Sequence, residues 1–114
     1  MNWLALLRSA QSLASRVTVA ASHQSEISCP EDWQLACAAS HLTFNTNTGR
    51  WERTFQIPAG EYEYKVAIDN SWEVNYGAGV GAGGSNIALN LPTATSVTFV
   101  WDQVTHIATH ALNN

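Results

Sequence analysis

Charged side chains are scarce in this sequence of 114 residues, and positively charged ones are the scarcest. Charged residues make up 12% of the chain, with five Lys and Arg against nine Asp and Glu, for a net charge of −4. The five cations form no cluster along the chain: Arg8, Arg16, Arg50, Arg53 and Lys65. A nucleic-acid-binding surface normally needs a dense basic patch, so we expect no nucleic acid partner.

The sequence also lacks a hydrophobic run of the length that crosses a membrane. Hydrophobic residues make up 46% of the chain and the mean hydropathy is −0.10, which is typical of a globular protein. A chain of 114 residues has the usual size of one domain and is too short for a catalytic barrel or a two-domain nucleotide enzyme. We therefore expect one monomeric module with no membrane partner.

Sequence signatures of catalysis are absent as well, because the chain has no GxSxG, Walker or HExxH motif. A glycosidase needs two opposed carboxylates. The carboxylates that could form such a pair are Glu63, Asp69 and Glu73. They lie near turns or on a polar strand face, where solvated carboxylates are expected, so such a pair would arise only by chance. His106 and His110 would lie roughly 13 Å apart in a strand, which is too far to chelate one ion. We predict no catalytic residue, no metal and no cofactor.

Cysteine is limited to Cys29 and Cys37, which are eight positions apart in a loop-like segment. The spacing contains no CxxC and no second metal-binding pair, so we favour a local disulfide over two free thiols, with a metal site as the weakest alternative. A disulfide here would stabilise the fold by about 2–3 kcal/mol in the chain-entropy picture. It would also imply export to an oxidising compartment.

Residues 1–16 differ in pattern from the rest of the chain. Apolar residues recur at helical spacing and predict a short amphipathic helix over 3–14. The segment has no basic start, and its apolar run breaks at Arg8, so it is not a convincing signal peptide. Two interpretations stay open: a signal remnant with Ser12-Leu13-Ala14 as a small-residue cleavage site, and a leader or linker without a role.

From residue 17 onward, polar and apolar residues alternate and turn residues recur at short intervals. The alternation is clearest over 50–57 and 61–68, and the last expected strand covers 105–109. Strands do not alternate with long helices, which disfavours a parallel α/β sheet. The pattern predicts an all-β antiparallel sandwich of about seven strands over residues 17–114.

Glycine is concentrated in one segment, with five of the seven glycines between residues 77 and 84. Glycine gives the backbone unusual conformational freedom. The segment is interpreted either as a flexible connection or as a loop where a ligand approaches the backbone closely.

Tryptophan is abundant, with five residues against three Tyr and three Phe. Trp51 and Trp101 share the strand parity of neighbouring phenylalanines, which predicts that both lie in the core. Trp33 and Trp72 fall in expected loops or strand ends, where an exposed ring favours a ligand contact. Because a glucose ring has an apolar face, such indoles suit sugar; covering about 80–100 Å² of apolar surface is worth roughly 2–2.5 kcal/mol before binding costs.

A set of ordered motifs extends over about residues 17–110. The motifs include Val17-Thr18-Val19-Ala20-Ala21-Ser22, Cys29-Pro30, Asp32-Trp33, Cys37-Ala38-Ala39, Ile57-Pro58-Ala59-Gly60-Glu61-Tyr62-Glu63-Tyr64-Lys65-Val66-Ala67, Ser71-Trp72-Glu73-Val74-Asn75-Tyr76-Gly77 and Phe99-Val100-Trp101-Asp102. With these motifs the chain resembles the non-catalytic module beside the catalytic domain of bacterial pullulanases and amylopullulanases. That resemblance implies an immunoglobulin-like sandwich without catalysis, an extracellular location and a neighbouring glycoside hydrolase domain as a partner.

The run from Pro58 to Lys65, followed by Trp72-Glu73, is more distantly similar to the starch-binding modules of amylases and glucoamylases. In that family a ligand site combines an early tryptophan, the lysine of this run and the tryptophan after the next turn. The resemblance implies that Trp33, Lys65 and Trp72 bind an α-glucan polysaccharide or maltooligosaccharide, with Glu73 and Asn75 as polar contacts. The alternative function is a structural spacer in a pullulanase-like enzyme, with no glycan affinity.

Overall fold

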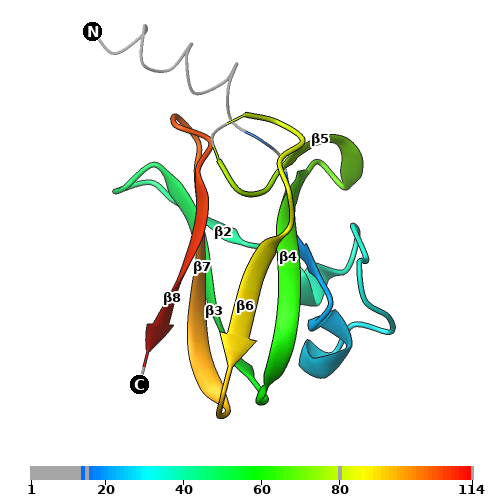
Figure 1. The fold of residues 1–114 in the computed structure, drawn as a ribbon. Coiled ribbons are helices and arrows are strands. Elements are labelled where there is room, and N and C mark those ends of the chain that lie inside the picture. The colour runs from blue at the N-terminus through cyan, green and yellow to red at the C-terminus, as the bar shows by residue number, and fades with distance from the viewer. Residues whose placement is uncertain (1–13, 15, 80, 114) are drawn as a thin grey trace, which may run out of the picture.

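The computed structural model describes residues 14, 16–79 and 81–113, which form two antiparallel sheets packed face to face (Figure 1). In the first sheet, β4 is central: β1 pairs with one edge, and β5 and β6 share the other. The strands of this sheet are β1 (Val17–Ala21), β4 (Gly60–Ile68), β5 (Ser71–Tyr76) and β6 (Ile87–Leu91). The second sheet has the order β2 (Thr43–Asn45), β3 (Arg50–Ile57), β7 (Thr95–Asp102) and β8 (Ala108–Asn113).

The predicted all-β antiparallel sandwich is therefore confirmed, with eight strands in the described residues where about seven were expected. The only helical elements in the described part are two short 3₁₀ turns, η1 (Gln24–Ile27) and η2 (Ala38–Ser40). Apart from Ala14, the helix expected over residues 3–14 lies outside the described residues. Among the described residues, no helix has the length and hydropathy needed to cross a membrane.

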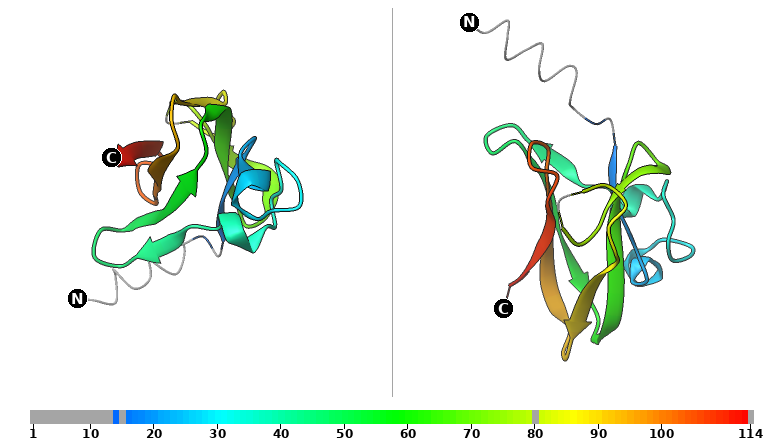
Figure 2. Two further views of the ribbon diagram at one scale, coloured as in Figure 1. Left: turned by 90° about the horizontal axis from the view of Figure 1, so that it is seen from below. Right: turned by 45° about the horizontal axis from the view of Figure 1, so that its top comes forward.

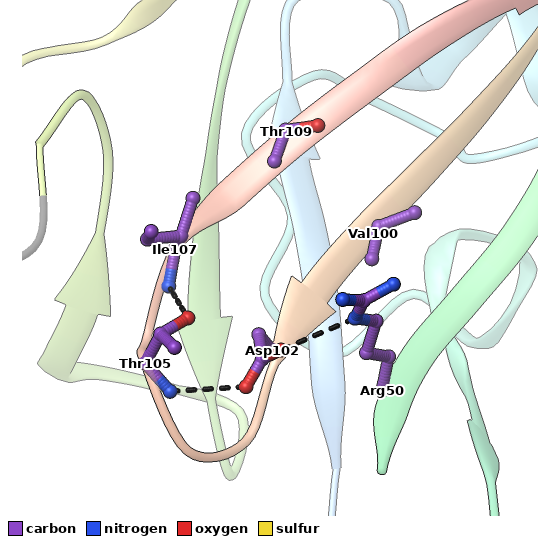
Figure 3. Close-up of a pocket in the computed structure, with 6 residues that line it drawn as sticks. All are labelled: Arg50, Val100, Asp102, Thr105, Ile107 and Thr109. Atoms are coloured by element: carbon purple, nitrogen blue, oxygen red, sulfur yellow. Dashed lines mark hydrogen bonds and ion pairs between the residues drawn. The ribbon is translucent and has the colours of Figure 1, made fainter. Parts of the chain in front are cut away.

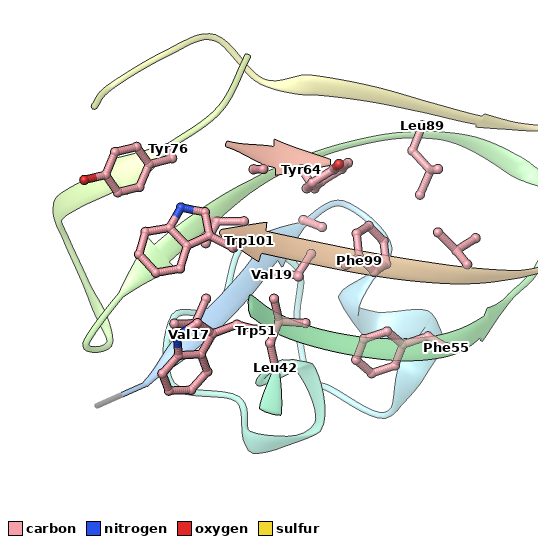
Figure 4. Packing of buried hydrophobic residues seen from close by; sticks show 14 of the residues in the cluster. Val17, Val19, Leu42, Trp51, Phe55, Tyr64, Tyr76, Leu89, Phe99 and Trp101 are labelled. Carbon is pink, nitrogen blue, oxygen red and sulfur yellow. The ribbon is translucent and has the colours of Figure 1, made fainter. Parts of the chain in front are cut away.

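The core lies between the two sheets, and strand alternation builds it (Figure 4). Along β7 every second side chain is buried, as expected for a strand with one face inward. Trp51 and Trp101 are opposite one another in the β3–β7 ladder and are 7% and 2% exposed. Their predicted place in the core is confirmed. Phe99, fully buried, meets the ring of Tyr64 edge-on from the other sheet at 4.9 Å between centroids.

The last strand begins later than the sequence pattern predicts, because residues 103–107 form a turn. The Asp102 carboxylate accepts hydrogen bonds from the backbone N–H groups of Val104 and Thr105, at 2.8 and 3.0 Å. His106 follows in the left-handed region with φ of 67°. The expectation that 105–109 is a strand is therefore wrong in its first three residues, and His106 lies in the turn rather than on the strand that carries His110.

The glycine-rich segment is a connection in which two stretches of backbone pack closely against each other. A Cβ at Gly77 would lie 2.0 Å from the Ser85 carbonyl oxygen, and one at Gly84 would lie 2.3 Å from the Ala78 carbonyl oxygen. The Ala78 N–H donates to that same Ser85 carbonyl at 2.8 Å. Close chain packing therefore accounts for these two glycines without a ligand.

A long loop covers the outer face of the first sheet. Figure 2 shows this blue-to-cyan segment, residues 22–42, beside β1, and its 3₁₀ turn η1 also contacts β3 of the second sheet. Thr18, Ala20 and Ala67 point away from the core by strand parity, yet all three are fully buried. The loop therefore supplies the cover, and it carries both cysteines and Trp33.

Candidate functional site

The loop over the first sheet is closed by a disulfide between Cys29 and Cys37, whose Cα atoms are 6.0 Å apart. This confirms the local disulfide over the two alternatives that the sequence left open. Trp33 lies in the middle of the closed segment. A short covalent loop restricts the positions that its central residue can reach, because both ends are fixed.

Trp33 has an uncommon backbone conformation, with φ of 59° in the left-handed region. A bulky residue adopts this region only where its surroundings impose it. Here the Trp33 N–H donates to the Ala21 carbonyl at the end of β1, at 3.0 Å. The backbone hydrogen bond thus ties the loop centre to the sheet and directs a half-buried indole over the outer face.

Trp72 reaches the same outer face because β5 pairs irregularly with β4. Ser71 is opposite Ile68 and Asn75 is opposite Ala67, so the register shifts between the two β4 residues. Ile68 packs against the core, so Ser71 opposite it has the inward parity and Trp72 points outward. Trp72 is 41% exposed, and its ring centroid lies 6.5 Å from that of Trp33, with 42° between the ring planes.

Lys65 lies on the same face as this tryptophan pair. It is opposite Ala20 in the β1–β4 ladder, next to the Ala21 residue that holds Trp33. On β4 it is two positions from Ala67, which is opposite Asn75. Its side chain is half-buried. The register therefore places Lys65 between the strand end that anchors Trp33 and the strand that carries Trp72.

The two remaining predicted contacts, Glu73 and Asn75, are on β5 beside Trp72. Glu73 is exposed, and its backbone N–H is held by the Ser71 hydroxyl at 3.0 Å. The Asn75 side-chain amide donates to the Trp72 carbonyl at 2.7 Å. Asn75 thus fixes the backbone of Trp72, while Glu73 is open to solvent.

Glu63 is a polar group on this face that the predicted site did not include. It alternates with Lys65 and Ala67 on β4, and its carboxylate accepts a hydrogen bond from the Asn86 amide at 2.8 Å. Strand parity was the signal that could have found it, because residues two apart on a strand share a face.

Residues 16–108 match the family model described as "Pullulanase X25 domain". The chain belongs to the pullulanase X25 domain family. It is 35% identical over 83 residues to an amylopullulanase of Thermoanaerobacterium thermosulfurigenes and 34% identical over 83 residues to one of Thermoanaerobacter thermohydrosulfuricus. Each match covers 73% of this chain but only 4% and 6% of the relatives, so the X25 chain spans a small part of their length.

A pullulanase structure from Bacillus acidopullulyticus shares the fold, with a TM-score of 0.73 and 23% sequence identity. The match covers 85% of this chain and 12% of that one. The X25 chain is thus an accessory domain of the kind found in pullulanases and amylopullulanases.

The X25 domain has a further cleft on the outer face of its second sheet, with a volume of about 350 Å³ (Figure 3). An Arg50–Asp102 ion pair at 3.1 Å lies beside the apolar side chains of Val100 and Ile107. Hydrogen bonds from Thr105 and Arg50 hold the pKa of the Asp102 carboxyl below its usual value. The carboxylate is thus already engaged by the turn and by Arg50, and none of the described residues that line this cleft is aromatic.

Histidine 23 is the most perturbed titratable group near the loop. Its ring is fully buried and stacks on Phe99 at 5.3 Å between centroids, and neither ring nitrogen has a hydrogen-bond partner. Burial lowers the pKa of His23 to about 4. Burial also lowers the pKa values of His41 and His110. His23 is therefore a neutral packing residue at the base of the loop.

Proposed function

We propose that this X25 domain is a non-catalytic module that binds starch-type α-glucan, such as pullulan, amylopectin or maltooligosaccharides. The observation that carries the proposal is the pair of surface indoles of Trp33 and Trp72, 6.5 Å apart on one face. Trp72 is 41% exposed, which is costly for a large aromatic ring that has no ligand.

The tilt between the two rings supports an α-glucan over a flat polymer. An α-1,4-linked chain curves, so the apolar faces of successive glucose units turn relative to one another. Two indoles inclined at 42° present surfaces that follow such a curve, whereas an extended β-linked chain fits coplanar rings better. Lys65 and Glu63 supply a donor and an acceptor for sugar hydroxyls at the edge of the rings.

Two stacked rings give weak binding, in about the micromolar-to-millimolar range. Weak binding suffices for a module tethered to a glycoside hydrolase, because the tether raises the effective concentration of enzyme at the polymer. The disulfide supports an extracellular location for the module and its parent enzyme. In this role the module targets the enzyme and performs no chemistry of its own.

The alternative function is a structural spacer that packs against a neighbouring domain. Exposed apolar side chains at and beside the β7–β8 turn favour this alternative, since Val104 is 80% exposed and Ile107 is 39% exposed. A spacer would bury these residues against its neighbour and would leave the indole pair without a ligand.

Calorimetric titration with maltoheptaose separates the two functions. We expect the unsubstituted domain to bind, Trp72→Ala to lose at least tenfold in affinity, and Val104→Ala to bind normally as a matched loss of exposed apolar surface. Cellohexaose should give little heat. Absence of binding by the unsubstituted domain would favour the spacer.

A further inference from the structure

Gln24 makes an unusual set of hydrogen bonds for a residue in a covering loop. Its side chain is fully buried, although polar side chains of this length are mostly exposed. The side-chain oxygen accepts from the backbone N–H groups of Ala21 and Gln34, at 3.1 and 2.7 Å. The side-chain nitrogen donates to the Gln34 carbonyl at 2.7 Å. One amide therefore satisfies three backbone groups.

These bonds connect the two chain segments that determine where Trp33 lies. Ala21 ends β1, and its carbonyl accepts the Trp33 N–H. Gln34 follows Trp33 directly, and both its backbone N–H and its carbonyl are bonded to Gln24. The backbone of Trp33 is thus fixed on one side by Ala21 and on the other by the Gln24 amide.

We propose that Gln24 is the positioning residue for Trp33. Its amide holds residues 33 and 34 in the conformation that directs the Trp33 indole toward Trp72. The effect of Gln24 on sugar affinity rests on the proposed function. Its effect on the geometry of the indole pair does not.

The chemistry of the site requires a primary amide of this length. A carboxylate would accept the two N–H groups but could not donate to the Gln34 carbonyl. An apolar side chain would leave the one buried and the two partly buried backbone groups without this partner, which destabilises the loop conformation. The disulfide closes the loop at Cys29 and Cys37 but leaves the conformation at its centre undetermined. Gln24 acts at that centre.

The test uses the circular dichroism exciton signal of the two coupled indoles, which needs no ligand. For each protein, the spectrum of its Trp72→Ala derivative is subtracted from its own spectrum. This subtraction removes the contribution of the core tryptophans and leaves the signal of the Trp33–Trp72 pair. We expect Gln24→Met to reduce this difference signal by at least half. Tyr64→Phe is the matched control: it removes one part-buried hydrogen bond, between the Tyr64 hydroxyl and the His110 ring, on the side of β8. It should leave the signal unchanged.

Affinity for maltoheptaose is measured on the same proteins. Gln24→Met should bind about fivefold or more weakly than the parent, because an unfixed indole must be ordered on binding. If the parent does not bind the sugar, the proposed function fails while the exciton signal still decides the role of Gln24. An unchanged exciton signal in Gln24→Met would overturn the inference, whatever the affinity.

A second measurement covers the case in which Gln24→Met does not fold. In the unsubstituted protein, hydrogen exchange by NMR should show slow exchange of the Gln34 backbone N–H and of the Gln24 side-chain amide, although both lie in a loop. Exchange as fast as that of the exposed Val104 turn would contradict the inference.

Discussion

The two outer faces of this sandwich differ in what covers them. On the second sheet the face carries exposed hydrogen bonds between its own side chains: the Thr54 and Thr98 hydroxyls are 2.7 Å apart, and Asn113 donates to Thr98 at 2.8 Å. On the first sheet only part of the outer face, at Thr18, Ala20 and Ala67, is buried under a disulfide-closed loop, and the tryptophan pair lies beside it. A solvated polar face needs no cover, whereas an aromatic site needs a support that holds its rings in place.

That difference also explains why the cleft on the second sheet is the weaker candidate for sugar. Its Asp102 already accepts three hydrogen bonds, from two turn N–H groups and from Arg50. The described residues that line it offer no ring on which a sugar face can stack. The first sheet presents two indoles beside a lysine. For glycan recognition the available ring surface decides between the two faces.

The largest effect that separates the faces should come from His23, which lies at the base of the covering loop. Its pKa is about 4 in the folded protein against 6.5 for a free imidazole, so the unfolded chain binds more protons between these values. The contribution of His23 to stability should therefore be lost as the pH falls from 6.5 to 4, with a total loss of about 3 kcal/mol.

Urea denaturation between pH 4 and 7 checks this dependence. His23→Phe should reduce the slope of stability against pH, with a residual slope from His41 and His110, whose pKa values are lowered in the same direction. An equal slope in the His23→Phe protein would show that this imidazole is not buried as a neutral group.

The next largest effect should come from opening the disulfide. Cys29→Ser with Cys37→Ser should lower the free energy of unfolding by about 2–3 kcal/mol, since the unfolded chain gains freedom. Maltoheptaose affinity should also fall, because the loop that carries Trp33 loses a constraint. Urea denaturation and calorimetric titration measure the two losses. A variant with lower stability and unchanged affinity would show that Gln24 and Ala21 hold Trp33 without the disulfide.

The smallest effects should come from one substitution on each face. Lys65→Met keeps the aliphatic chain but removes a hydrogen-bond donor, so affinity for maltoheptaose should fall by up to about tenfold.

Thr98→Val removes two exposed hydrogen bonds and should cost less than about 1 kcal/mol of stability, with affinity unchanged. Calorimetry and thermal denaturation of the two variants give both values. Loss of affinity in Thr98→Val would indicate that the sugar binds the second sheet, which contradicts the proposed site on the first sheet.

The sequence was sufficient for the parts of the fold that depend on local alternation. Strand parity correctly placed Trp51 and Trp101 in the core, because alternate residues of a half-buried strand face inward. The same alternation gave a wrong start for the last strand, because a turn precedes it. The Asp102 carboxylate accepts a hydrogen bond from the Val104 backbone N–H, and β8 begins only at Ala108. The same simple alternation would have placed Trp72 with the buried Tyr76, and only the irregular pairing of β5 brings Trp72 outward.

The candidate site was predictable in part. Trp33, Lys65 and Trp72 were named from a family resemblance, and the structure brings these residues to one outer face of the first sheet. Gln24 was missed because nothing local marks a glutamine whose partners are Ala21 and Gln34. Those contacts exist only after the loop folds back on β1, which one sequence without the fold does not show.

The most direct test of the account follows the indole and backbone N–H resonances during titration with maltoheptaose. The account predicts that the signals of Trp33 and Trp72 move on addition of sugar, while those of the buried Trp51 and Trp101 stay in place. Shifts centred on Arg50 and Asp102, or no shift at either surface indole, would contradict the claim that this pair is the glucan site.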